Sequence, residues 1–232
     1  MKDDQNKIRV LTWNIHSGIG PDGTYDLVRI VNLIRHHDPD IIALQEVDSR
    51  GHSDTEKPLP FLKTALGSHA AEARTIITPD GHYGHVVISR WPFTEVTHHD
   101  ISVSRRERRC AIETMIETPW GPLHFVAAHL GLSPFERRKQ ARVLANLARR
   151  DVRPTIMLGD FNDWLLRGTV RRALDKIMPG HTTHRTFPAK WPLLSLDKVY
   201  CRPRNAIIRS WTDNAARVVS DHLPVFADIR LS

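Results

Sequence analysis

The sequence predicts an α/β protein that forms a single domain over residues 1–232. Short apolar runs of strand length alternate with segments of helical apolar spacing, and twice the order is strand, helix, strand. The middle of the chain consists of short strands separated by turn residues. No segment resembles a linker, the polar start Met1–Lys7 lacks the apolar stretch of a signal peptide, and no apolar run approaches the ~18 residues of a transmembrane helix.

The first strand–helix–strand unit predicts a polar edge. Ile8–Trp13 is an apolar strand, a helix ends at Asp38-Pro39, and Ile41–Leu44 is the next strand. Because the strands of such a unit are parallel and usually adjacent, we expect Asn14 and Glu46, which follow them, at the same sheet edge. An amide and a carboxylate there can ligate a hard cation. For Glu46 alone, a solvated loop acid is the ordinary alternative.

The central region predicts strands that lead to a histidine. A short helix over Phe61–Leu66 ends at Gly67, and short strands follow from Ala73 to Thr118. A hairpin turn over Pro119–Pro122 then leads into a strand over Leu123–His129. A lone histidine at a strand end is more often structural than catalytic.

The second strand–helix–strand unit carries the most informative stretch. A capping box over Ser133–Glu136 begins a helix that continues to about Arg150, and its basic residues are expected to form a solvated face: Arg137, Arg138, Lys139 and Arg142. A buried strand then begins at Thr155, and its carboxyl end carries Asp160, Asn162 and Asp163. Ligands of α/β proteins bind at such ends. The alternative is an Asx-type turn that stops the strand and caps the next helix.

The last part of the chain predicts one helix, a polar loop and three strands. The helix includes Val170, Leu174 and Ile177, and the loop covers Met178–Trp191. We expect the strands over Leu193–Tyr200, Ala206–Trp211 and Leu223–Leu231. Asp197 lies within the first of these strands, and Asp221-His222 precedes the last.

Composition suggests an anionic partner. The net charge is +7, the pI is about 9.8 and 25 of the 33 basic residues are arginine, which suits nucleic acid or an acidic lipid surface. A base-composition bias in the gene would produce the same arginine excess. Cys110 and Cys201 could pair, but they make neither a disulfide framework nor a zinc site. The polar start, the lack of a transmembrane run and the lack of a disulfide framework together favour a cytoplasmic location.

Several short motifs also occur in a known order. They are Thr12-Trp13-Asn14, Leu44-Gln45-Glu46, Val87-Ile88-Ser89-Arg90, Arg109, His129-Leu130, Gly159-Asp160-Phe161-Asn162, Asp197 and Ser220-Asp221-His222. In this order the chain resembles the endonuclease/exonuclease/phosphatase superfamily, which includes pancreatic-type deoxyribonuclease and abasic-site endonucleases. The likeness is closest to small bacterial members. In two departures, His85 stands where close relatives often carry asparagine, and His82 stands where other branches have a tyrosine or an acid.

The resemblance implies both a fold and a site. The fold is a four-layer α/β/β/α sandwich of two mainly antiparallel or mixed β-sheets flanked by helices, with the site at their shared upper edge. Mg²⁺, for which Mn²⁺ can substitute, would be held by Glu46, Asn14 and Asp221. His222, oriented by Asp197, would be the general base or a phosphate contact. The remaining roles would be positioning of water and phosphate by Asp160 and Asn162, charge stabilisation by His129, and substrate binding by Arg109 and His82.

The expected function is Mg²⁺-dependent phosphodiester hydrolysis by a monomer, and the basic charge of the protein favours DNA or RNA as the substrate. Cleavage of a phospholipid, inositol or sphingomyelin head group is the alternative, because an anionic membrane surface would also attract a basic protein. The aromatic hairpin of sphingomyelinases and the basic motifs of inositol phosphatases are not evident. A non-catalytic scaffold is a third interpretation, but a scaffold has no reason to retain the histidines and acids together.

Overall fold

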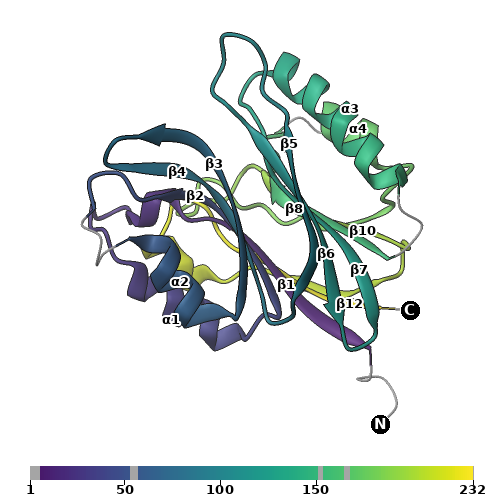
Figure 1. Cartoon of the computed structure of the whole chain (residues 1–232), viewed down its shortest axis with the longest axis horizontal. Helices are drawn as coiled ribbons and strands as arrows, with labels where there is room; N and C mark the ends of the chain where they lie inside the picture. The colour runs from purple at the N-terminus through teal and green to yellow at the C-terminus, as the bar shows by residue number, and fades with distance from the viewer. Residues whose placement is uncertain (1–5, 53–56, 151–153, 165–167, 232) are drawn as a thin grey trace.

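Two six-stranded β-sheets pack face to face in the computed structural model, with helices on both outer faces (Figure 1). The structure describes residues 6–52, 57–150, 154–164 and 168–231, so the start of the chain up to Gln5 lies outside it. The first sheet has the strand order β11-β12-β1-β2-β4-β3, and the second β5-β6-β7-β8-β10-β9. The predicted four-layer α/β/β/α sandwich is confirmed.

The first sheet carries helices α1 and α2. Its strands are β1 (Lys7–Asn14), β2 (Ile41–Asp48), β3 (His69–Thr78), β4 (Gly81–Ser89), β11 (Ile207–Trp211) and β12 (Val225–Arg230), and its helices are α1 (Leu27–His37) and α2 (Pro58–Leu66). Strands β1 and β2 are parallel, with Asn14 opposite Gln45. Asp26 caps α1 by accepting the N–H groups of Val28 and Arg29 at 2.8 and 3.1 Å. The first predicted strand–helix–strand unit therefore has the expected parallel pairing.

The second sheet carries helices α3 and α4. Its strands are β5 (Phe93–Asp100), β6 (Cys110–Thr118), β7 (Gly121–His129), β8 (Thr155–Asp160), β9 (Gly180–His181) and β10 (Asp197–Arg202), and its helices are α3 (Pro134–Arg150) and α4 (Thr169–Leu174). Strands β7 and β8 are parallel, with His129 opposite Asp160. Gly159 permits this close pairing, because a Cβ there would lie 1.8 Å from the carbonyl oxygen of Ala128.

Three apolar layers hold the sandwich together. The central layer joins the inner faces of the two sheets, for example through Val10, Phe125 and Val199. The outer layers pack α1 and α2 on the first sheet and α3 and α4 on the second. Two short 3-10 helices, η1 (His16–Gly18) and η3 (Asn214–Val218), lie in loops at the ends of strands.

Several predicted boundaries were wrong. The helix predicted over Phe61–Leu66 begins at Pro58, the strand predicted from Ala73 begins at His69, and the helix predicted to include Ile177 ends at Leu174. The strand predicted from Leu193 begins only at Asp197. Residues before Asp197 bond to the preceding loop instead, since Thr186 Oγ1 accepts the N–H of both Leu196 and Asp197 at 3.3 Å.

Arg137 does not belong to a solvated face, although Arg138, Lys139 and Arg142 are exposed as expected. The Arg137 side chain is fully buried, donates to the carbonyl oxygen of Leu132, and stacks 4.1 Å from the ring centroid of Trp164. The capping box itself is confirmed, because the Glu136 carboxylate accepts the Ser133 N–H at 3.1 Å.

Two further features bear on the sequence expectations. Cys110 and Cys201 are both free thiols, so they do not form the disulfide left open above. Across the residues that the structure describes, no helix has both the length and the apolarity needed to cross a bilayer.

Candidate active site

Polar side chains from both sheets meet at one edge of the sandwich. Asn14, Glu46, His129 and Asp160 lie at or near the carboxyl ends of β1, β2, β7 and β8. Asp197 begins β10, which is antiparallel to β8 and places Asp197 opposite Asp160. Asp221 and His222 precede β12, which is antiparallel to β1. A strand that is antiparallel to its neighbour begins at the edge where that neighbour ends. The starts of β10 and β12 therefore lie at the same edge as the carboxyl ends of β8 and β1.

Asn14 links the two sheets across this edge. Its Nδ2 donates to Glu46 Oε1 at 2.8 Å and to Asp160 Oδ2 at 3.1 Å. Its Oδ1 accepts the backbone N–H of His16 at 3.0 Å. Glu46 sits at a β-bulge opposite β4 with φ +59°, which turns its side chain out of the regular strand alternation. The amide therefore holds together two carboxylates from different sheets.

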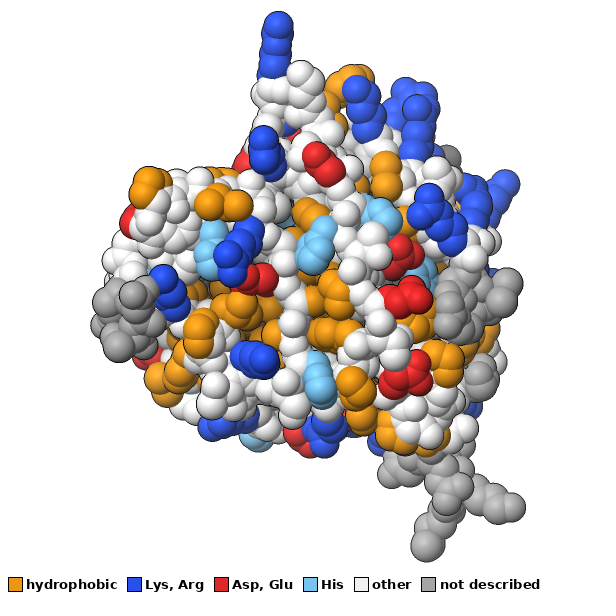
Figure 2. All heavy atoms as spheres, viewed as in Figure 1, with side chains coloured by type: hydrophobic (Ala, Val, Ile, Leu, Met, Phe, Trp, Pro, Cys, Tyr) orange, Lys and Arg blue, Asp and Glu red, His pale blue; other side chains and the backbone are white. Residues whose placement is uncertain are grey.

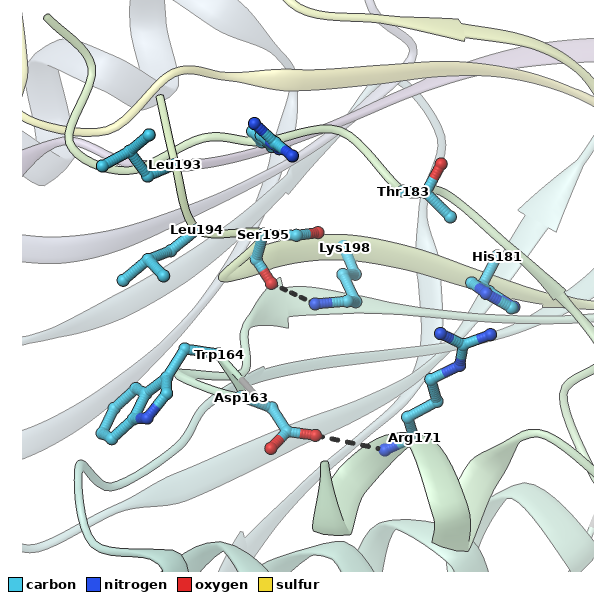
Figure 3. Close-up of a pocket in the computed structure, with 10 residues that line it drawn as sticks. Asp163, Trp164, Arg171, His181, Thr183, Leu193, Leu194, Ser195 and Lys198 are labelled. Carbon is cyan, nitrogen blue, oxygen red and sulfur yellow. Dashed lines mark hydrogen bonds between the residues drawn. The ribbon is translucent and has the colours of Figure 1, made fainter. Parts of the chain in front are cut away.

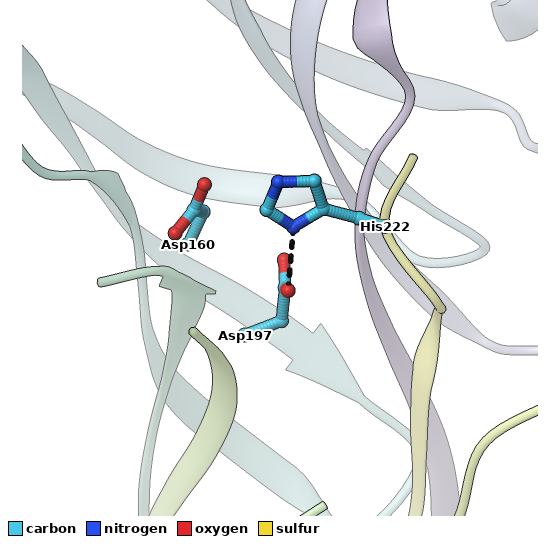
Figure 4. A group of neighbouring side chains, drawn as sticks. All are labelled: Asp160, Asp197 and His222. Atoms are coloured by element: carbon cyan, nitrogen blue, oxygen red, sulfur yellow. Dashed lines mark hydrogen bonds and ion pairs between the residues drawn. The ribbon is translucent and has the colours of Figure 1, made fainter. Parts of the chain in front are cut away.

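Asp197 and His222 form an enclosed polar pair (Figure 4). Asp197 Oδ2 lies 2.8 Å from His222 Nδ1, and Asp160 lies beside the imidazole ring. The loop that precedes β10 connects β10 with the start of β12, because the Leu223 N–H donates to the carbonyl oxygen of Thr186 in that loop at 2.9 Å. Ser220 Oγ adds a second link, donating to the carbonyl oxygen of Asn14 at 2.8 Å. The Nδ1 contact leaves the Nε2 atom of His222 available to other groups.

Burial and charge drive the pKa values of Asp160 and His222 apart. Burial, reinforced by the Asp197 carboxylate, raises the pKa of Asp160 to about 6. Burial opposes the charged form of His222, but the neighbouring carboxylates of Asp197, Asp160 and Asp221 outweigh it and raise its pKa to about 10. At neutral pH the arrangement therefore favours an imidazolium beside two carboxylates.

His129 is held as a neutral imidazole of defined tautomer. Arg109 Nη1 lies 2.9 Å from His129 Nδ1, and because a guanidinium can only donate, Nδ1 must accept. The Nε2–H therefore points toward Asp160, whose Oδ2 lies 3.6 Å away. Burial, with Arg109 and His85 nearby, lowers the pKa of His129 well below its usual value. The hydrogen-bond partner of His129 Nδ1 is thus Arg109.

The Asp160–Asp163 segment combines both functions that the sequence left open. Asp160 Oδ1 accepts the Asn162 N–H at 2.9 Å, which is an Asx turn, and Asn162 Nδ2 donates to the carbonyl oxygen of Leu130 at 3.0 Å. Asp163 Oδ2 accepts the N–H groups of Val170 and Arg171 at 3.1 and 3.3 Å and so caps α4. Asp160 and Asn162 face the site, whereas Asp163 starts a helix.

A more open group of oxygen donors lies beside the enclosed pair. Glu46 and Asp221 keep 24% and 39% of their side chains exposed. His16 Nδ1 lies 3.8 Å from Glu46 Oε2 and 3.6 Å from Asp221 Oδ1, so one imidazole connects the two acids. Asp221 Oδ1 is buried and has no hydrogen-bond partner among the described residues. An enclosed carboxylate oxygen without a donor suits a cation.

Two sets of side chains could therefore hold a metal ion. Asp160, Asp197 and His222 present ligand atoms within 4.8 Å of one another, but all three are buried and His222 Nδ1 is committed to Asp197. Glu46 and Asp221 are oxygen donors at a more open position, and the buried Asn14 lies beside them with its Oδ1 accepting the His16 N–H. Mg²⁺ usually keeps several waters and binds substrate phosphate, so the open set fits it better.

His82 lies apart from these contacts. Its ring bonds to Ser49 Oγ at 3.2 Å and pairs with Glu72 at 3.3 Å. Its neighbour Tyr83 points to the opposite face of β4, where burial and the nearby Glu46 carboxylate raise its pKa. Sequence reasoning missed Tyr83 and His16. Strand alternation starting from His85 could have indicated Tyr83, whereas His16 gave no periodic signal.

Known proteins resemble this chain in sequence and in fold. A model of the Endonuclease/Exonuclease/phosphatase family matches residues 11–222. The uncharacterized protein YbhP of Escherichia coli K12 is 32% identical over 253 residues, covering 98% of both chains. An endonuclease/exonuclease/phosphatase structure from Beutenbergia cavernae aligns with a TM-score of 0.81 at 22% identity, covering 98% of this chain and 72% of that one. The 3′ phosphatase NExo from Neisseria, bound to a product DNA hairpin, aligns with a TM-score of 0.70 at 18% identity over 96% and 99% of the two chains.

Proposed function

The chain belongs to the Endonuclease/Exonuclease/phosphatase family, and on this premise we propose that it is a divalent-metal-dependent phosphodiesterase that cleaves nucleic acid. One observation carries the proposal: Asp160 lies among Asn14, His129 and the Asp197–His222 pair at a single edge of the sandwich. This edge combines a buried carboxylate, a cationic imidazole and a neutral one. A purely structural edge does not need three such groups side by side.

Asp160 is the proposed general base. Its raised pKa keeps it a stronger base than an ordinary aspartate while leaving it mainly ionised at neutral pH. It takes a proton from the water that attacks phosphorus, and Asn162 in the same turn positions the phosphate. The P–O bond to the leaving oxygen breaks, and that oxygen takes a proton from solvent. His222, held by Asp197 through Nδ1, contributes an Nε2–H and a positive charge to a phosphoryl oxygen. Two neighbouring groups with diverging pKa values suit these opposite roles.

His129 acts on the same phosphate from the second sheet. With its tautomer set by Arg109, it donates the Nε2–H to a phosphoryl oxygen beside Asp160. Arg109 is buried and also pairs with Glu107 at 3.2 Å, so we assign it to orienting His129 rather than to direct substrate contact. Substrate binding by His82 stays a prediction from the sequence.

Glu46, Asn14 and Asp221 are the residues that would hold Mg²⁺ or Mn²⁺. When bound there, the ion would neutralise negative charge on the phosphoryl oxygens. Asp221 Oδ1, which accepts no hydrogen bond from the described residues, and the exposure of Glu46 support this placement. Glu46 and Asp160 both bind the Asn14 amide, so the proposed metal and base positions are adjacent.

Charge near the site favours a polyanionic substrate. The loop that precedes Arg109 carries three exposed arginines, namely Arg105, Arg106 and Arg108. Figure 2 shows lysine and arginine side chains on this projecting loop and along the side of the molecule formed by α3. Such a surface attracts the phosphate backbone of DNA or RNA. The product DNA bound to NExo shows that one protein of this fold acts on nucleic acid.

A substrate panel tests the proposal. Purified protein would be assayed on DNA, RNA, abasic DNA, phospholipid vesicles and bis(p-nitrophenyl) phosphate, each with Mg²⁺, Mn²⁺ or EDTA. We expect cleavage of a nucleic acid that requires the divalent ion. Turnover confined to phospholipid would indicate head-group hydrolysis, and full turnover in EDTA would exclude the metal role. A monomeric state, a cytoplasmic location and a single catalytic domain over residues 1–232 stay predictions.

A further inference from the structure

A pocket adjoins the candidate active site, because its lining residues Asp163 and Lys198 directly follow the site residues Asn162 and Asp197. It has a volume of about 240 Å³ and lies between the loop after β8, the start of α4, strand β9 and the loop before β10. Figure 3 shows Lys198, Arg171 and His181 projecting into the same hollow from three different elements. Arg185, from the loop between β9 and β10, also lines it. Basic groups therefore surround the pocket from four segments of the chain.

The buried ammonium group of the lining is bonded to a neutral group. Lys198 is only 8% exposed, and its ammonium group bonds to the carbonyl oxygen of Ser195, which carries no charge. Asp163 is the one carboxylate that lines the pocket, and its Oδ2 is occupied by the backbone N–H groups at the start of α4. Lys198 is the buried cation of the lining, whereas Arg171 pairs with Asp175 at 3.3 Å and Arg185 is exposed. Buried cations normally have anionic partners, so the ammonium group of Lys198 is the group most in need of an anion.

Buried polar atoms of the pocket also lack partners. His181 Nδ1 and Ser195 Oγ are buried and form no hydrogen bond within the described parts of the chain. Both residues line the pocket beside Lys198. Since buried polar atoms are almost always hydrogen-bonded, these two indicate that a polar ligand completes the site. A hydroxyl, an imidazole, an ammonium and two guanidinium groups together supply donors for several oxygen atoms.

The pocket shares its walls with the catalytic edge. Lys198 follows Asp197 in β10, and Asp163 follows Asn162 in the loop after β8. Because successive side chains of a strand point to opposite faces, Asp197 faces the site and Lys198 faces the pocket. At the rim, Trp164 is 40% exposed and Leu193 is 66% exposed, so apolar and aromatic surface adjoins the basic hollow.

We propose that this pocket binds a phosphate group of the substrate strand that neighbours the scissile phosphate, with the adjoining base or sugar lying against Trp164 and Leu193. The proposal rests on the proposed nuclease activity and specifies its substrate: a strand with at least one phosphate beyond the one that is cleaved. Arginine forks and a lysine ammonium match the tetrahedral oxygens of a phosphate monoester or diester. The aromatic rim fits a nucleotide, since every base has a face that can stack.

Three dinucleotides test the pocket through hydrolysis. TpT has only the scissile phosphate, whereas pTpT and TpTp each carry one more, at opposite ends. We expect one of the two phosphorylated dinucleotides to have a KM about tenfold below that of TpT, the scale of one or two charge-assisted hydrogen bonds. This preference should fall to about one in Arg185→Ala and in Lys198→Met. Arg185 is exposed, so its variant remains informative if Lys198→Met does not fold.

Arg204→Ala is the matched control, because it removes the same charge from an exposed turn beyond the far end of β10. It should retain the preference for the phosphorylated dinucleotide. Equal KM values for all three substrates in the unsubstituted protein would overturn the assignment. So would a preference that persists in both pocket variants.

A binding measurement separates this proposal from the proposed hydrolysis. Inorganic phosphate would be titrated calorimetrically into the protein in EDTA, where no divalent ion can hold phosphate at the catalytic edge. We expect a dissociation constant of about 1 mM, weakened about tenfold in Arg185→Ala and unchanged in Arg204→Ala. If no dinucleotide is cleaved, the nuclease proposal fails, but phosphate binding lost in Arg185→Ala would still support an anion pocket. Absence of any binding would overturn it.

Discussion

Removing the His222 side chain should leave the buried Asp197 carboxylate without its cationic partner, and a second substitution that removes the negative charge should restore part of the lost stability. The Asp197 side chain is fully buried and its Oδ2 bonds to His222 Nδ1 at 2.8 Å, while its Oδ1 has no partner among the described residues. Asp160 lies opposite it in the strand register. In His222→Ala, two buried carboxylates face each other without the imidazolium between them. We therefore expect Asp197→Asn to be destabilising alone and stabilising in the His222→Ala background.

The magnitudes follow from burial of the pair. Removing one partner of a buried ion pair costs about 3–5 kcal/mol, so His222→Ala should lose about 3 kcal/mol once protonation of a carboxylate relieves part of the repulsion. Asp197→Asn retains an oxygen that can accept from Nδ1–H and should cost about 1.5 kcal/mol. The double variant should regain about 1–2 kcal/mol relative to His222→Ala, because the second change removes an uncompensated charge.

Urea denaturation at neutral pH in EDTA would measure the four free energies of unfolding without a contribution from bound metal. The same four proteins would be assayed for kcat with metal present. His222→Ala should lower kcat by at least ~10²-fold, and Asp197→Asn should add little to that loss if the two residues act as one unit. Additive destabilisation together with multiplicative losses of kcat would show that Asp197 does not act through His222.

Three other predictions address the metal, the histidine tautomer and the far end of the first sheet. Glu46→Gln should weaken Mn²⁺ binding, measured by titration calorimetry, and lower kcat by at least ~10²-fold; unchanged affinity would exclude Glu46 as a ligand. Arg109→Met removes the donor to His129 Nδ1 and should lower kcat about tenfold, with a changed ¹⁵N chemical shift of that ring showing loss of the fixed tautomer. Although burial opposes ionisation of Asp228, hydrogen bonds from Arg9 and Arg209 at 2.7 Å lower its pKa. Its stabilisation is therefore present above the ordinary aspartate pKa of about 4 and is lost as pH falls through the lowered native value. Asp228→Asn should cost about 2 kcal/mol at pH 7, and a gap from the unsubstituted protein that did not narrow below about pH 4 would contradict this linkage.

Local patterns in the sequence were sufficient to predict the strand–helix–strand units and most of the polar edge, whereas the four-layer sandwich was implied by the resemblance to a known family. Asn14, His129 and Asp160 each end an apolar run of strand length, and the strand–helix–strand order makes β1–β2 and β7–β8 parallel. The carboxyl ends of parallel neighbours lie at one edge, so these side chains could be placed there without coordinates. The capping box at Ser133 likewise predicted the start of α3, because capping depends on residues only three apart.

Contacts between distant segments could not be read from such patterns. Arg137 has the spacing of an exposed helical residue, yet it is buried because Trp164 and the carbonyl oxygen of Leu132 receive its guanidinium group. His16 shows no periodic signal, and it reaches Glu46 and Asp221 only because the turn after β1 folds back over the edge. In each case the side chain is placed by what another element presents to it.

The sequence by itself determined which residues end the strands and which edge they reach. The periodicity of apolar residues indicates where a helix or strand ends and which of its faces each side chain occupies. Only the tertiary structure decided which of them touch. The 2.8 Å contact of Asp197 with His222, the strand start at Asp197 and the pocket behind Lys198 all depend on how the loop around Thr186 packs between two strands of different sheets. The free energy of a buried charge depends on the partner that lies opposite it. That partner comes from a distant part of the chain, and the apolar pattern of the strand that carries the charge does not indicate which part.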